Sequence, residues 1–115
     1  MPCINIRLRR EGVQLDIKGF AHKLAQQMDI EVERINIIVD YYDETDAFMG
    51  SNADQLIIIL WISERNEKQF IKNLVKSTAD LAKKYFHKEG RSTAVMCNLI
   101  KEGHLFISNQ IKKEE

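Results

Sequence analysis

Apolar and polar residues alternate along residues 3–9, so that Ile4, Ile6 and Leu8 share one face. This two-residue period is typical of a strand with one buried face. Over residues 15–28 the apolar residues instead recur at the three- and four-residue spacing of an amphipathic helix. The chain is therefore predicted to open with a strand and to continue into a helix.

The rest of the chain repeats this order of elements. Residues 35–42 are rich in β-branched and aromatic residues and predict a second strand. Residues 56–62 are apolar on both alternating sets, which is typical of a strand covered on both faces. A helical pattern follows from Asn66 to about His87, and residues 93–100 predict a fourth strand. A short fifth extended segment is expected at residues 104–108.

This order predicts an α+β fold made of two βαβ units. Right-handed crossovers placed side by side give one four-stranded mixed sheet with both helices on one face. We expect a single domain over residues 1–115, with pseudo-repeat halves at about 1–53 and 54–115. The other sheet face is left open, and burying even ~300 Å² of it offers several kcal/mol at roughly 25 cal/mol/Å². The pattern therefore predicts an obligate oligomer.

Charge and composition exclude several classes of protein. Seventeen basic residues balance seventeen acidic ones, which argues against a nucleic-acid partner. The longest apolar run, residues 56–62, is far shorter than the roughly 20 residues that cross a bilayer. Charges also interrupt the N-terminal segment too early for a signal peptide, so a cytoplasmic protein without a membrane partner is expected.

The chain has two cysteines, Cys3 and Cys97, and three histidines, and their spacing fits no metal site. We expect no metal ion and no cofactor. Both thiols are expected to be reduced in the cytoplasm, although a bridge stays open if their strands are neighbours.

The residue with the clearest candidate chemistry is Pro2. A small residue after Met1 usually permits removal of the methionine, which would leave Pro2 with a free secondary amine. A free α-amino group titrates near ~8, and an apolar pocket or a nearby cation would lower that pKa. Such an amine could act as a base near neutral pH. If Met1 is retained, the nitrogen is an amide and this chemistry is blocked.

The Met-Pro start, the immediate first strand and the two βαβ units resemble the tautomerase superfamily, which includes 4-oxalocrotonate tautomerase and macrophage migration inhibitory factor. Tyr41-Tyr42, Phe48 and Leu60-Trp61 with the downstream Arg65 are similar to uncharacterised tautomerase-like members. The resemblance implies a trimeric barrel assembly. It also implies that the N-terminal proline acts as general base and then acid on a keto–enol pair, while cationic side chains hold the substrate carboxylate.

Carried over by position, the resemblance makes Pro2 the catalytic residue and places Phe48 in the pocket wall. Arg7 could face the pocket from its strand, or it could form an ion pair between subunits. Arg65 could hold a carboxylate, although a solvated turn arginine is the commoner outcome. Tyr41 could enter the site as a hydroxyl donor; Tyr42 points to the opposite strand face, so at most one of the two is expected there.

The superfamily's own substrate arginines do not carry over, because their positions fall near Gly12 and on Asn36. The long loop at residues 43–54 could carry function, or it could be a flexible connection without a functional role.

Three functions therefore stay in competition. The first is a tautomerase or isomerase that acts through Pro2 on a small 2-oxo or enol carboxylate. The second is a non-catalytic trimeric ligand-binding or interaction protein on the same scaffold. The third is a ferredoxin-like nucleic-acid module, which the neutral charge and the lack of an exposed aromatic pair on a basic sheet disfavour.

Overall fold

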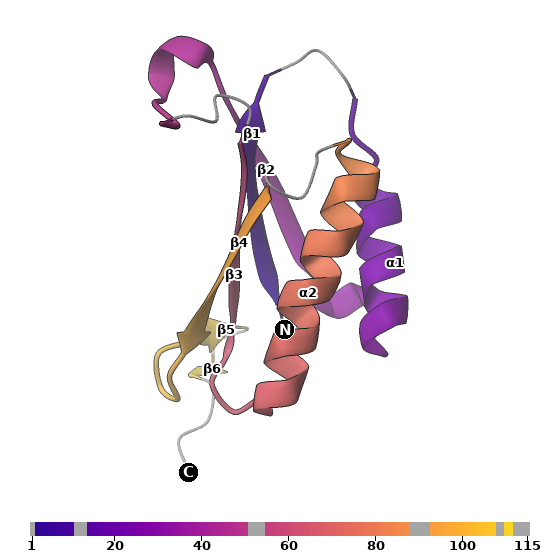
Figure 1. The fold of residues 1–115 in the computed structure, drawn as a ribbon. Helices are drawn as coiled ribbons and strands as arrows, with labels where there is room; N and C mark the ends of the chain where they lie inside the picture. Colours follow the sequence, from indigo (N-terminus) through magenta and orange to yellow (C-terminus); the bar gives the residue numbers. More distant parts are fainter. Residues whose placement is uncertain (1, 11–13, 51–54, 88–92, 108–109, 112–115) are drawn as a thin grey trace.

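The computed structural model describes residues 2–10, 14–50, 55–87, 93–107 and 110–111. Within them it contains, in chain order, strand β1 (Cys3–Arg9), helix α1 (Ile17–Met28), the short helix η1 (Val32–Arg34), strand β2 (Asn36–Tyr42), the short helix η2 (Glu44–Asp46), strand β3 (Leu56–Ser63), helix α2 (Lys68–Tyr85), strand β4 (Thr93–Ile100) and the two-residue strands β5 (Phe106–Ile107) and β6 (Gln110–Ile111). Figure 1 shows both long helices on one face of the main sheet. The predicted strands and helices are confirmed, with bounds that shift by up to two residues.

The main sheet has the strand order β2-β1-β3-β4. β1 and β2 are parallel, as are β3 and β4, because each pair is joined through a helix that returns the chain to the same end of the sheet. β1 and β3 are antiparallel and join the two βαβ units. The predicted four-stranded mixed sheet is therefore confirmed. The boundary expected at residues 53–54 lies outside the described residues.

The core lies between the helices and one alternating set of strand residues. Ile4, Ile6 and Leu8 of β1 lie beside the buried set of β3, and both sets pack under Phe20 of α1 and Leu74 of α2. The predicted half-buried character of β1 follows from this packing. The buried β3 set consists of Leu56, Ile58, Leu60 and Ile62.

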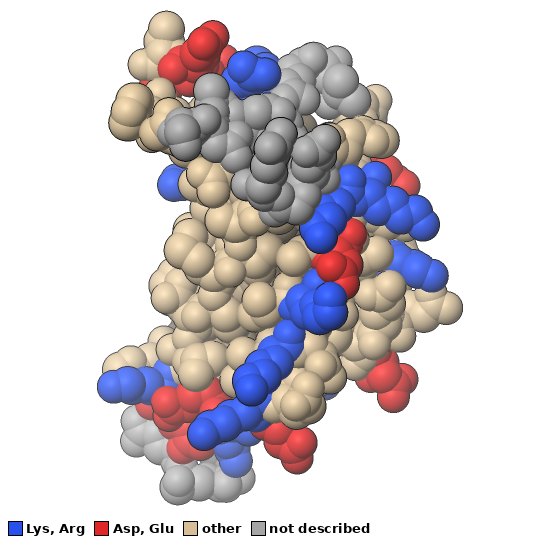
Figure 2. All heavy atoms as spheres, in the orientation of Figure 1, with Lys and Arg blue, Asp and Glu red and all other residues tan. Residues whose placement is uncertain are grey.

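The opposite sheet face is uncovered and largely apolar. Ile38 is 67% exposed, Met96 50% and Trp61 45%. Figure 2 shows Lys and Arg side chains in a row across the helix layer, whereas the sheet side carries mainly uncharged atoms. β3 is therefore apolar on both sets, as the pattern predicts, but only one of them is covered within a single chain.

The short extended segment expected at residues 104–108 is present as β5, which pairs antiparallel with β6. Both thiols are free, as expected. The condition for a bridge between Cys3 and Cys97 is not met, because β3 separates their strands and the register puts the two side chains on opposite sheet faces. Among the described helices, none combines the length and apolar content that crossing a membrane requires.

Candidate functional site

Pro2 is buried at the start of β1. Its carbonyl oxygen accepts a hydrogen bond of 3.0 Å from the backbone N–H of Asn36, the first residue of β2. The residue lines a cavity of about 60 Å³ together with Ile30, Arg34, Ile62, Asn66 and Phe70. Pro2 is thus held in a fixed position beside a small cavity that both apolar and polar residues line.

Three segments meet around this cavity because of the strand order. β1 runs parallel to β2, so the turn that precedes β2 brings Arg34 to the start of β1. β1 runs antiparallel to β3, so the end of β3 lies at that same edge of the sheet and contributes Ile62. The first turn of α2 follows directly and contributes Phe70.

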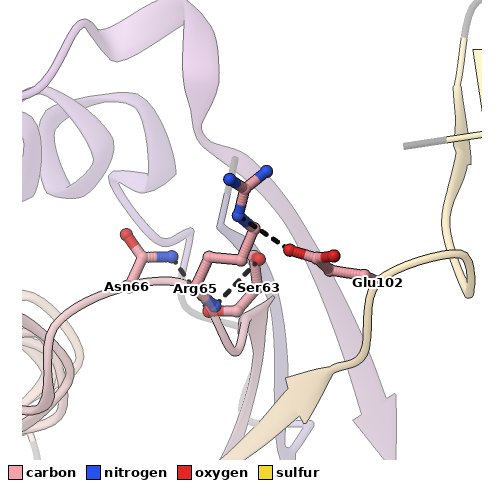
Figure 3. A network of polar contacts seen from close by, with 4 residues as sticks. All are labelled: Ser63, Arg65, Asn66 and Glu102. Atoms are coloured by element: carbon pink, nitrogen blue, oxygen red, sulfur yellow. Dashed lines mark hydrogen bonds and ion pairs between the residues drawn. The ribbon is translucent and has the colours of Figure 1, made fainter. Parts of the chain in front are cut away.

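The polar groups of the cavity differ in how they are paired. The Asn66 amide nitrogen donates to the Ser63 carbonyl at 3.0 Å, and Figure 3 shows the amide oxygen pointing away from Ser63. Arg34 is exposed, and within the described part of the chain no acidic side chain lies within ion-pair distance of its guanidinium. The cavity therefore brings one amide side chain and one arginine together with four apolar residues.

Arg65 lies at the same end of the sheet as Pro2 but does not line this cavity. Its Nε is 2.9 Å from Oε1 of Glu102, and its backbone N–H donates to Ser63 Oγ at 3.2 Å. Figure 3 shows this Nε facing Glu102, whose side chain is only 23% exposed, and the two terminal nitrogens of Arg65 pointing away from it. A carboxylate ligand at Arg65 would have to compete with this ion pair.

The other three residues predicted for the site gather at the opposite end of the sheet. Arg7, Tyr41 and Phe48 line a second cavity of about 370 Å³, to which Tyr42 and Asp40 also contribute. Arg7 follows Pro2 by five residues on an extended strand, which separates them by about 16 Å at roughly 3.3 Å per residue. Within one chain, the structure therefore groups these three with each other and not with Pro2.

A third, open cavity of about 400 Å³ lies beside Trp61 and includes Lys101 and His104. Among the described residues, no three His, Cys, Asp or Glu side chains gather closely enough to hold a metal ion.

No protein-family model matches the sequence, and no curated protein matches it by sequence. Solved structures do match. A fused 4-OT described as a wild-type asymmetric trimer superposes with a TM-score of 0.83 at 15% identity, covering 95% of this chain and 94% of that chain. Macrophage migration inhibitory factor from Oncomelania hupensis gives a TM-score of 0.77 at 7% identity, covering 98% of this chain and 83% of that one. This chain has the fold of the tautomerase superfamily.

A third structure with the tautomerase fold, the protein Pt0534 inactivated by 2-oxo-3-pentynoate, gives a TM-score of 0.80 at 9% identity. It covers 96% of this chain and 94% of that chain. The expected fold family is thereby confirmed.

Sequence reasoning missed two residues beside Pro2 on this tautomerase fold, Arg34 and Asn66. The sequence pattern pointed instead to Arg7 within the first strand and to Arg65 just after the third. In a parallel βαβ unit, however, the residues that precede the second strand lie beside the start of the first. Arg34 stands two residues before Asn36, so the predicted topology already contained the signal.

Proposed function

We propose that this protein is a keto–enol tautomerase or isomerase, whose base is the amine of Pro2 after removal of Met1. The proposed substrate is a small 2-oxo or enol carboxylate. The observation that carries this proposal is the burial of Pro2 beside a small cavity that Arg34 lines together with Ile30, Ile62 and Phe70. An amine in these surroundings is biased toward its neutral form, since burial and a nearby cation both disfavour the ammonium ion.

In the proposed reaction, the Pro2 nitrogen accepts the proton from the enol oxygen, and the resulting ammonium delivers a proton to the neighbouring carbon. The carbonyl forms as the carbon–carbon double bond is lost, so atoms and charge balance and the amine is regenerated. The apolar walls formed by Ile30, Ile62 and Phe70 limit the access of water to the amine. No cofactor is needed for this proton transfer.

We also propose that the protein is a homotrimer and that Arg7, Tyr41 and Phe48 serve the site across a subunit interface. Two observations support this. The side chain of Phe48 is 90% exposed within one chain, and fused 4-OT, which has the same fold, forms trimers. Since Arg7 lies far from Pro2 of its own chain, its cavity could meet Pro2 only from a neighbouring protomer.

The experiment begins with the intact mass of the protein, which reports whether Met1 has been removed. Conversion of phenylenolpyruvate is then compared between the wild type and Pro2→Ala. Alanine also permits removal of Met1, so both proteins start at position 2 and differ in the nature of the amine. We expect the variant to lose most of the activity and the wild type to show a rate that rises with pH as the amine loses its proton.

A second measurement uses 2-oxo-3-pentynoate. An amine adds to the triple bond of this electrophile without a leaving group, so the labelled protein should gain the mass of one reagent molecule at Pro2. Retention of Met1, or equal conversion by the wild type and Pro2→Ala, would contradict the proposal. The non-catalytic ligand-binding protein would then be the better description.

A further inference from the structure

We propose that the outer surface of α2 is a binding site for a linear polyphosphate, a flexible chain of phosphate groups without bases. The site is a lysine ridge made of four exposed side chains, Lys68, Lys72, Lys76 and Lys83. None of them lines any of the three cavities described above. The proposal therefore does not depend on tautomerase activity at Pro2.

The balanced total charge of the chain hides an uneven distribution. α1 and α2 together contain seven lysines and a single acidic residue, Asp80. The rest of the sequence therefore carries ten basic and sixteen acidic residues. All six arginines also lie outside the two helices. The helix layer is thus a positive surface on a chain whose net charge is zero.

The ridge forms because lysines recur at helical spacing on the side of α2 that faces away from the core. Lys68, Lys72 and Lys76 follow one another every four residues, about 6 Å along the helix axis, and the ridge spans about 22 Å up to Lys83. Figure 2 shows this row of basic side chains along the helix layer, with an acidic side chain near its upper end. The opposite side of the helix is buried through Leu74, Thr78, Leu81 and Ala82.

The first half of the ridge works against the stability of its own helix. Lys68 begins α2, whose first turn contains no acidic residue, although the positive end of the helix dipole favours acidic residues there. Like charges four residues apart, as in Lys68, Lys72 and Lys76, also repel each other. Among the described residues only Asp80 forms ion pairs with the ridge, at 3.1 Å from Lys76 and 3.8 Å from Lys83. A polyanion lying along the ridge would relieve this repulsion.

The chemistry of the helix layer favours a phosphate chain over other anionic partners. Its cations are all lysines, which bind phosphate as point charges, whereas the planar fork of arginine is the better match for carboxylates. No large apolar side chain that is exposed in the described part of the chain lies on α1 or α2. The layer therefore offers no apolar anchor for a folded protein, no wedge for a bilayer and no aromatic platform for nucleic-acid bases. A polyphosphate needs only the row of charges.

The test measures binding of an end-labelled linear polyphosphate by fluorescence anisotropy over a range of salt concentrations. Four phosphate contacts should make the logarithm of the affinity fall with the logarithm of the salt concentration at a slope of about −3. The ridge variant, which combines Lys68→Gln, Lys72→Gln and Lys76→Gln, should lose about tenfold or more in affinity. It should also lose most of the salt dependence, and circular dichroism checks that it is folded.

Two other proteins separate the ridge from general charge effects. The control combines Arg9→Gln, Arg10→Gln and Lys101→Gln, which remove the same number of charges outside the helices, and it should bind close to the wild type. Asp80→Asn removes the acidic partner of Lys76 and Lys83, so it should bind about two- to fivefold more tightly than the wild type. A helix face that is merely solvated would not respond in opposite directions to these changes.

The results that would overturn the proposal are specific. One is a wild type that does not bind polyphosphate at low salt, and another is an equal loss of affinity in the ridge variant and the control. Tighter binding of single-stranded RNA, polyglutamate or vesicles with anionic lipids than of polyphosphate would overturn the choice of ligand. Pro2→Ala should bind polyphosphate like the wild type, so this proposal and the proposed function fail independently.

Discussion

Replacing Ile38 by lysine should dissociate the proposed trimer. Ile38 lies near the middle of edge strand β2, on the uncovered sheet face, and lines none of the three cavities described above. Full burial of an isoleucine side chain contributes about 1.5–3 kcal/mol, and 67% of Ile38 is exposed in the single chain. Its burial between protomers would then contribute about 1–2 kcal/mol per protomer, or about 3–6 kcal/mol per trimer.

This energy corresponds to a loss of roughly 10²- to 10⁴-fold in the monomer–trimer association constant, before the cost of burying the lysine charge is added. Sedimentation velocity over a micromolar concentration range measures the change. The fold of the protomer should be preserved, because the isoleucine side chain points to solvent in the single chain. Circular dichroism and urea unfolding check this point.

The matched control is Gln27→Lys, which places the same charge on the exposed surface of α1, in the layer opposite the uncovered face. It should sediment like the wild type. Two results would refute the reasoning: a wild type that is a stable monomer at micromolar concentration, or an Ile38→Lys variant that associates as tightly as the wild type.

Further predictions concern stability and the thiols. Asp16 caps α1 by accepting a 2.9 Å hydrogen bond from the N–H of Gly19, so Asp16→Ala should lower the unfolding free energy by about 1 kcal/mol in urea unfolding. A Cβ at Gly19 would meet the Asp16 carboxylate, so Gly19→Ala should stabilise the helix only in the Asp16→Ala background. An equal gain in unfolding free energy in the wild-type and Asp16→Ala backgrounds would contradict this prediction. The Thr78 hydroxyl is fully buried with no hydrogen-bond partner among the described residues. Thr78→Val should therefore raise the unfolding free energy by about 1 kcal/mol. A decrease of that size in the unfolding free energy would mean that the hydroxyl is paired. Burial raises the pKa of the Cys97 thiol, so folding favours its neutral form. The contribution of Cys97 to the unfolding free energy should be present at about pH 7 and decline toward about pH 10, because the thiol ionises more readily in the unfolded chain. Urea unfolding of the Cys97 and Cys97→Ala proteins, both carrying Cys3→Ser, measures this contribution at each pH. A difference in unfolding free energy between the two proteins that does not change with pH would count against the prediction.

The sequence by itself determined the elements and their order, because these depend on local periodicity. The alternation at residues 3–9 and the apolar run at 56–62 became β1 and β3, since a two-residue period specifies which side chains face the core. The helix expected at residues 15–28 begins two residues later, at Ile17, because Asp16 serves as its N-cap. The two βαβ units then followed from the general handedness of crossovers.

Only the tertiary structure decided which side chains meet. The register of β1 with β2 and β3 brings Arg34 and Asn66 to Pro2, and it places Arg7 at the far end of the sheet. Arg65 is paired with Glu102, 37 positions later in the chain, and no local pattern contains that contact. Strand order and register arise from packing between distant segments, so the sequence could name Pro2 as the candidate base, while the fold decided which cation lies beside it.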